Sequence, residues 1–213
     1  MGKKRKLNSY ETNKVNRLSN DEKWFFDDIF TKKVDIGNQS RAKKIIFLDI
    51  DGVLNDNKNN KVLVEEERIK RVKKIIDATG AEVVLSSSRR LIYWKYLNLE
   101  NYTDRDMEKF QSLLDKYDIK IIDNTPEFNL FGYETRPYEI KAWLMNNPRI
   151  ESFVILDDDP WTWRWLSHFV VRTARPIPNE KYEKLYGLED EDVERAIEIL
   201  NRDPTKNEKE EEK

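Results

Sequence analysis

Short runs of consecutive apolar residues recur along the chain and are the first structural signal in the sequence. They lie at residues 45–48, 82–85, 120–122, 153–156 and 169–172. Strands that are buried on both faces of a parallel sheet show continuous runs of this kind rather than strict alternation. We therefore predict five strands in one parallel sheet.

Between these runs, apolar residues are spaced as on one face of a helix. Ile69, Val72 and Ile75 have this spacing, and Gly80 follows as a helix-ending residue. The pattern predicts helices over residues 64–79, from Asp104 onward, from Pro137 to about Asn146, and over 189–200. Strands that alternate with helices indicate a three-layer, Rossmann-like α/β fold. Apart from the helix after Asp104 and the strand that follows it, residues 90–135 are expected to form only loops.

The two ends of the chain differ from its middle. Residues 1–18 hold six basic residues and one acidic residue, which predicts a disordered basic arm. Residues 19–42 are predicted to form a short helix and a linker, and residues 203–213 a charged, disordered tail. The folded domain is expected over residues 43–202.

Composition removes several classes of chemistry. The 213 residues include no cysteine, which excludes disulfides, thiolate zinc sites and cysteine nucleophiles. They include one histidine, His168. The glycines form neither of the common nucleotide-binding loops. No apolar stretch approaches a membrane span and no signal-peptide pattern opens the chain, so we expect a cytoplasmic protein with no membrane partner. Catalysis would have to use carboxylates, hydroxyls, lysines and arginines.

Acidic residues follow two of the predicted strands. Asp49 and Asp51 come after the first strand, and Asp157 and Asp158 come after the fourth. The carboxyl ends of parallel strands meet at one edge of the sheet, where ligands bind. If these two strands are neighbours, the carboxylates converge, and a divalent cation with oxygen ligands, Mg²⁺, would relieve their repulsion. The alternative is that these residues only cap helices or form turns.

The spacing of Asp49 and Asp51 has a chemical logic. Both side chains can point toward the same edge of the sheet before Gly52 allows a tight turn. One carboxylate can attack phosphorus, and the other can donate a proton to the leaving oxygen.

The residues at the strand ends resemble a known family. Residues 47–55 (FLDIDGVLN) are similar to the first motif of the haloacid dehalogenase (HAD) superfamily of phosphoaspartate phosphatases. Ser86 matches the second motif, a hydroxyl that binds the transferring phosphoryl group. Arg136 fits the basic third motif by position, with Lys141 as the alternative. Residues 154–158 resemble the acidic fourth motif.

This resemblance extends from about residue 43 to residue 200 and implies a Mg²⁺-dependent phosphohydrolase. Asp49 would be the nucleophile and Asp51 the general acid and base, while Ser86 and Arg136 or Lys141 would stabilise the phosphoryl oxygens. The metal would be held by Asp49, Asp51, Asp157 and Asp158. The resemblance also implies a five-stranded sheet in the order 5-4-1-2-3.

The serines that follow the second strand point to one branch of the superfamily. The run SSSRR and the later LDDD are similar to the small HAD domains of bacterial and viral RNA-repair proteins, although Arg90 stands where a Trp-Arg pair is expected. Ser87, Ser88, Arg89 and Gly52 are the expected phosphate- and substrate-binding residues. Arg89 and Arg90 both lie beside the expected phosphate site, where bidentate anion binding is natural.

The expected substrate is large, because the short connections leave no room for a cap domain. A capless site excludes water poorly unless the substrate covers it, which favours a large substrate such as a polynucleotide end or a phosphoprotein. The basic arm, the two arginines, the tryptophans and the resemblance to RNA-repair domains favour terminal phosphates of RNA or DNA. Three alternatives stay open: a catalytically silent module that binds nucleic acid or protein, a phosphatase of small metabolites, and a phosphotransferase. Trp161, Trp163 and Trp165 would either stack a base or pack the following helix onto the sheet.

Overall fold

The fold is taken from a computed structural model, in which residues 43–56, 64–128, 135–147, 149–159, 166–176 and 184–202 are described. In chain order the elements are β1 (Lys43–Leu48), α2 (Glu66–Thr79), β2 (Glu82–Leu85), α3 (Arg90–Asn98), α4 (Arg105–Lys116), β3 (Ile121–Asn124), α5 (Arg136–Asn146), β4 (Ile150–Asp157), the 3-10 turn η1 (Ser167–Phe169), β5 (Val170–Arg172), β6 (Arg175–Pro176), β7 (Lys184–Leu185) and α6 (Asp190–Asn201). The predictions for residues 1–18, 19–42 and 203–213 and for the three tryptophans at 161, 163 and 165 lie outside the described residues.

Five strands form one parallel sheet in the order β3-β2-β1-β4-β5. This is the predicted α/β fold with the predicted strand order, and both are confirmed. The central strand β1 pairs with β2 on one side and β4 on the other, so the two acidic strand ends are neighbours. A short antiparallel pair, β6 and β7, lies outside the main sheet and was not predicted.

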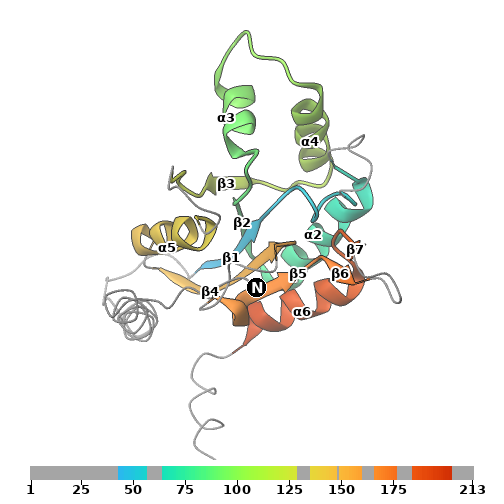
Figure 1. The fold of residues 1–213 in the computed structure, drawn as a ribbon, viewed down its shortest axis with the longest axis vertical. Helices are drawn as coiled ribbons and strands as arrows, with labels where there is room; N and C mark the ends of the chain where they lie inside the picture. The colour runs from blue at the N-terminus through green and yellow to red at the C-terminus, as the bar shows by residue number, and fades with distance from the viewer. Residues whose placement is uncertain are drawn as a thin grey trace, which may run out of the picture. The chain divides into compact units, whose positions relative to one another are not determined.

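Helices cover both faces of this sheet, and the alternation of β1 side chains separates the two faces. Ile46 and Leu48 belong to a buried cluster that also contains the apolar side chains of α2, α4 and α6. Phe47 points to the opposite face, where its ring meets Trp143 of α5 edge-on at 5.4 Å and Phe153 of β4 at 5.8 Å. Figure 1 shows α5 and α6 on opposite sides of β1 and β4. The result is the three-layer arrangement expected for such a sequence.

Two helix ends use the residues that the sequence pattern indicated. The Asp104 side chain accepts hydrogen bonds from the backbone N–H groups of Asp106 and Met107, both at 3.0 Å, and so caps α4. Gly80 has a φ of 69° and its N–H donates to the Ile76 carbonyl at 2.7 Å, which closes α2.

One prediction for this region was wrong. Residues 90–98 were expected to be loop, but they form helix α3. Its apolar residues Leu91, Trp94 and Leu97 are exposed, so the apolar positions do not mark a buried face and the pattern alone gave no clear helix signal. Among the described residues, no helix combines the length and apolar character needed to cross a membrane.

Trp143 is the main contact that fixes α5 on the sheet. The residue is 5% exposed, its ring packs on Phe47, and its Nε1 donates to Asp123 Oδ2 at 2.7 Å. We expect Trp143→Ala to lower the free energy of unfolding by about 3–5 kcal/mol, measured by urea denaturation. Met145→Ala on the same helix is the control, because Met145 is 59% exposed and should change stability by less than about 0.5 kcal/mol. Equal effects of the two substitutions would contradict this account of the packing.

Candidate active site

A row of polar residues crosses the carboxyl edge of the sheet. Each residue directly follows a strand or ends one, and backbone hydrogen bonds of 2.8–3.0 Å join each to the neighbouring strand. The row runs in sheet order through Thr125, Ser86, Asp49, Asp157 and Thr173. All five side chains are buried, with exposed fractions of 5% or less. The fold therefore collects polar side chains from five strands in one line.

The row faces the same side of the sheet as α5. Asp49 lies two residues beyond Phe47, and alternate residues of a strand share a face. Asp157 stands in the same relation to Ile155, which is in register with Phe47. Because Phe47 packs on α5, the acidic side chains lie beneath the beginning of that helix.

Three carboxylates meet in this region. One oxygen from each of Asp49, Asp157 and Asp158 lies within 4.8 Å of the others. Burial, and then the charge of Asp49, raise the pKa of Asp157 to about 7. The same two causes raise the pKa of Asp158 to about 6. The carboxylates therefore disfavour one another's charge unless a cation is present.

Arg136, the first residue of α5, supplies positive charge to this group. Its Nη1 donates to Asp157 Oδ2 at 2.6 Å and also to Asp49 Oδ2. Burial opposes the charge of the guanidinium, but the two carboxylates outweigh it and raise the pKa of Arg136 above its usual range. The remaining oxygen of Asp49 accepts the N–H of Ile50 at 2.7 Å, which orients the carboxylate.

The two candidates for the basic third motif differ in position. Arg136 contacts two of the three carboxylates, whereas Lys141 is half-buried five residues further along α5. Five residues correspond to about 140° around a helix, so the two side chains leave α5 in different directions. The geometry of Arg136 fits the role of that motif.

The turn after β1 places Asp51 beside Arg89 rather than in the carboxylate group. Arg89 Nε donates to Asp51 Oδ2 at 2.7 Å, and this hydrogen bond raises the pKa of Arg89. Asn55 steadies the turn, because its Oδ1 accepts the N–H of Gly52 at 2.9 Å and its Nδ2 donates to Asp51 at 3.4 Å. Asn55 was not singled out from the sequence, although it is the last residue of the FLDIDGVLN motif.

Two features require a glycine at position 52: the backbone conformation there and the lack of room for a side chain. Its φ is +71°, and a Cβ at this position would lie 2.4 Å from Cγ of Asp158. Its carbonyl accepts hydrogen bonds from Thr173 Oγ1 at 2.7 Å and from the N–H of Gly187 at 2.9 Å. The glycine thus lets the turn approach the fourth-strand acids closely and adds no side-chain contact of its own.

The three serines after β2 have different environments. Ser86 is 1% exposed, and its Oγ has no hydrogen-bond partner among the described residues. Ser87 is fully buried, and its Oγ accepts the N–H of Arg89 at 3.2 Å, so it supports the turn. Ser88 is exposed. Only Ser86 therefore combines a place beside Asp49 with a free buried hydroxyl, and such groups normally find a partner.

Arg90 and Glu139 form a buried ion pair at 2.9 Å, and this pair was not predicted. Arg90 also donates to the carbonyls of Ser87 at 2.7 Å and Pro126 at 3.3 Å, and Glu139 accepts the N–H of Phe128 at 3.1 Å. The sequence placed Arg90 beside the expected phosphate site without deciding whether it binds anions. Its two terminal nitrogens bond within the protein, which favours a structural role. Sequence alone does not reveal that Glu139 is its partner.

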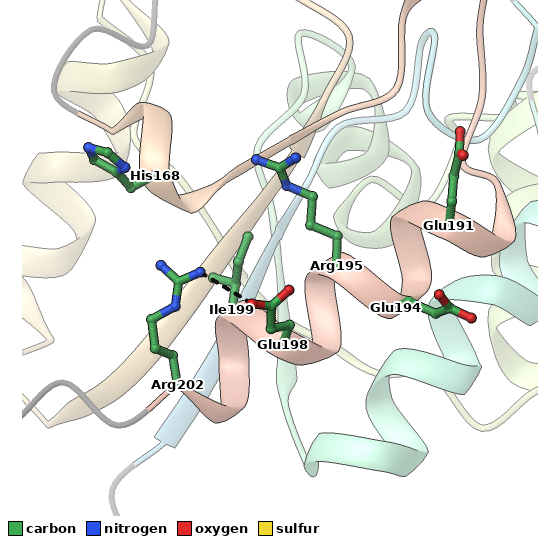
Figure 2. Close-up of a pocket in the computed structure, with 7 residues that line it drawn as sticks. All are labelled: His168, Glu191, Glu194, Arg195, Glu198, Ile199 and Arg202. Carbon is green, nitrogen blue, oxygen red and sulfur yellow. Dashed lines mark ion pairs between the residues drawn. The ribbon is translucent and has the colours of Figure 1, made fainter. Parts of the chain in front are cut away.

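A hollow elsewhere on the surface is separate from these residues. It is lined by charged side chains of α6, including Arg195 and Glu198, by Arg202 directly after that helix, and by His168 of η1 (Figure 2). α6 packs on the face of the sheet opposite α5, so the hollow is not part of the carboxylate site.

A family model matches most of the part of the chain that carries this site. Residues 45–176, more than half of the chain, match the family described as the HAD domain in Swiss Army Knife RNA repair proteins. The chain belongs to this family. The matched range includes every residue of the carboxylate site but not α6. No curated protein and no solved structure matches the chain. Membership of this HAD family supports a phosphohydrolase of the HAD type.

The raised pKa of Asp157 predicts a pH-dependent stability of the metal-free protein. The folded state holds a proton on Asp157 up to a pH near 7, whereas the unfolded chain loses it near the ordinary pKa of 3.8. The unfolded state then binds fewer protons, so the free energy of unfolding falls as the pH rises through this window. Asp157→Asn has no carboxyl to ionise, and we expect its stability relative to wild type to increase from about pH 5 to about pH 8.

Urea denaturation in the presence of EDTA at the two pH values measures this difference. Glu151→Gln is the control, because Glu151 is an exposed carboxylate on the same strand, outside the carboxylate group. A difference between Asp157→Asn and wild type that is the same at both pH values would show that Asp157 does not carry the repulsion.

Proposed function

We propose that this domain is a Mg²⁺-dependent phosphohydrolase that acts through a phosphoaspartate on Asp49. The observation that carries the proposal is the position of Asp49. Its carboxylate lies in a buried group with Asp157 and Asp158, bonded to Arg136 and next to the unpartnered hydroxyl of Ser86. A nucleophile, a counter-charge and a hydroxyl donor are thus adjacent, as transfer of a phosphoryl group requires.

The carboxylate group fits a divalent cation. The donors are all oxygens, which suits Mg²⁺. Burial, and then the charge of Asp49, raise the pKa values of Asp157 and Asp158, and a cation would offset both effects. Asp49, Asp157 and Asp158 would hold the ion. When bound, Mg²⁺ supplies positive charge that neutralises the phosphoryl oxygens. The Asp51 carboxylate, also considered as a ligand, lies beside Arg89 and fits a proton-transfer role better.

The reaction uses this chain's residues in two steps. First, a carboxylate oxygen of Asp49 attacks phosphorus as the bond to the leaving oxygen breaks, and Asp51 gives that oxygen a proton. Then water attacks the phosphoaspartate, Asp51 takes the proton from this water, and the bond between Asp49 and phosphorus breaks to release phosphate. Asp51 ends in its starting protonation state, so no further reactant is needed.

Ser86 and Arg136 would stabilise the phosphoryl oxygens. Ser86 Oγ has no acceptor within the described protein and would donate to one oxygen of the substrate. Arg136 is held by two carboxylates and its charge is therefore already in position when negative charge develops on the oxygens. Lys141 leaves α5 about 140° around the helix from Arg136, so we assign this role to Arg136.

We further propose that the substrate is the terminal phosphate of a polynucleotide. The family's association with RNA repair supports this choice. Within the described residues, α2 alone connects β1 to β2, and α3 and α4 connect β2 to β3, so these connections supply no separate cap domain. A site without a cap relies on a large substrate to exclude water.

The nucleophile is tested by Asp49→Asn. The amide keeps the size of the side chain but has no charge and cannot form the phosphoaspartate, so turnover should fall about a thousandfold or more. Release of phosphate from a phosphorylated oligonucleotide, measured with and without Mg²⁺, gives the rates. Asp77→Asn on the exposed side of α2 is the control and should keep full activity. Retention of more than about a tenth of the wild-type turnover by Asp49→Asn would rule out this mechanism.

The substrate class is tested by comparing an end-phosphorylated RNA or DNA oligonucleotide with sugar phosphates and free nucleotides. We expect the oligonucleotide to have the highest kcat/KM, and its binding to weaken as salt rises because phosphate contacts release counterions. A preference for small metabolites would indicate a metabolite phosphatase. Mg²⁺-independent binding of the oligonucleotide with no turnover would indicate a silent binding module.

A further inference from the structure

Helix α3 carries an apolar stripe that the described protein leaves uncovered. Leu91, Trp94 and Leu97 are spaced three residues apart and are 43%, 50% and 53% exposed. The opposite side of α3 is the packed side, where the Tyr93 ring meets the Phe110 ring of α4 at 5.4 Å. The stripe is therefore not needed to hold α3 in place. Figure 1 shows α3 and α4 side by side, extending away from the sheet.

The stripe is continuous with the proposed phosphate site. β2 ends at Leu85, the turn of residues 86–89 holds the unpartnered Ser86 hydroxyl, and α3 begins at the next residue. Trp94 lies on the second turn of α3, about 6 Å along the helix axis from its first residue, Arg90. The helix that carries the stripe therefore begins directly at the turn that would hold the phosphate.

The charge of this segment favours a polyanion over a protein partner. Residues 86–99 contain three basic residues and no acidic residue, in a chain with a net charge of −2. Arg89 and Arg90 are paired with carboxylates, but Lys95, next to Trp94, is exposed and has no ion pair among the described residues. An exposed tryptophan beside a free cation is the combination that binds a base and its phosphate in single strands.

We infer that the exposed face of α3, with Trp94 at its centre, is a stacking platform for the unpaired base next to the terminal phosphate of a single-stranded polynucleotide. This inference rests on the proposed function, because it names the part of the substrate that the same site holds. Trp94 supplies the aromatic face, Leu91 and Leu97 flank the base, and Lys95 meets the backbone. Stacking accepts every base, so the platform selects single-stranded ends without reading sequence.

The experiment removes the base from the oligonucleotide and the aromatic ring from residue 94 of the protein, first separately and then together. Two end-phosphorylated oligonucleotides are compared, one intact and one with an abasic terminal nucleotide. Their dissociation constants are measured by fluorescence anisotropy in Asp49→Asn protein, which does not turn over, with Trp94 either intact or replaced in Trp94→Ala. Loss of one stacked base should weaken binding by about 5- to 150-fold.

If Trp94 stacks on the base, either change alone produces this loss, and the two together produce no further loss. Trp94→Phe should keep most of the affinity, and Met145→Ala, an exposed apolar position on α5, should keep all of it. Because Trp94 is half exposed, Trp94→Ala should melt within a few degrees of wild type, so a loss of fold would be detected. Additive losses, or equal affinity for both oligonucleotides, would overturn the inference.

Two further outcomes separate this inference from other possibilities. If a wild-type dimer becomes a monomer in Trp94→Ala while oligonucleotide binding is unchanged, α3 docks a second copy of the chain and the inference fails. If the wild-type protein hydrolyses neither oligonucleotide but binds the intact one through Trp94, the stacking platform stands and the phosphatase proposal fails. The binding readout thus tests the platform independently of catalysis.

Discussion

The repulsion among three carboxylates, two of them buried and the third half-buried, is the constraint on which the rest of this structure depends. Asp49, Asp157 and Asp158 lie within 4.8 Å of one another because parallel strands β1 and β4 end side by side. A folded protein cannot leave such a group fully ionised without a counter-charge. Arg136 supplies part of that charge, yet burial and then the charge of Asp49 still raise the pKa values of Asp157 and Asp158. The three carboxylates could therefore hold a further cation.

The register of the sheet also places hydroxyl side chains in line with the carboxylates. Hydrogen bonds across the strand ends align Ser86 with Asp49, and Thr125 with Ser86, so hydroxyls continue the row that the carboxylates begin. The hydroxyls of Ser86 and Thr125 are both buried and without partners among the described residues. Unmade hydrogen bonds of this kind destabilise a fold, and they are retained most readily where a ligand completes them. One sheet edge thus offers negative groups for a cation and donors for an anion.

Sequence patterns are sufficient for the parts of this arrangement that follow from chain direction alone. Apolar runs locate the strands, and the carboxyl ends of parallel strands must meet at one edge, so the pattern places Asp49 and Asp157 at the same edge of the sheet. That their strands are neighbours was implied by the family resemblance and is confirmed by the pairing of β1 with β4. The choice between Arg136 and Lys141 cannot be made in this way, because it depends on how α5 is rotated against the sheet. The pairing of Asp51 with Arg89 cannot be predicted from the pattern either, because it depends on the path of a single turn. Helix α3 escapes prediction because apolar residues lie on its packed side and also on its exposed side, so their spacing marks no single face.

Helix α5 shows why stability and chemistry are hard to separate in this domain. Arg136 and Glu139 lie one turn apart at its beginning; the first bonds to the carboxylates, and the second to Arg90 beneath the serine turn. The beginning of α5 therefore fixes the position of the carboxylates and also that of the turn that holds Ser86. The helix in turn is held by Trp143 against Phe47, two residues before Asp49 on the same strand. A change in that packing would move Arg136 relative to the carboxylates, so the apolar face of α5 controls the charge balance around Asp49.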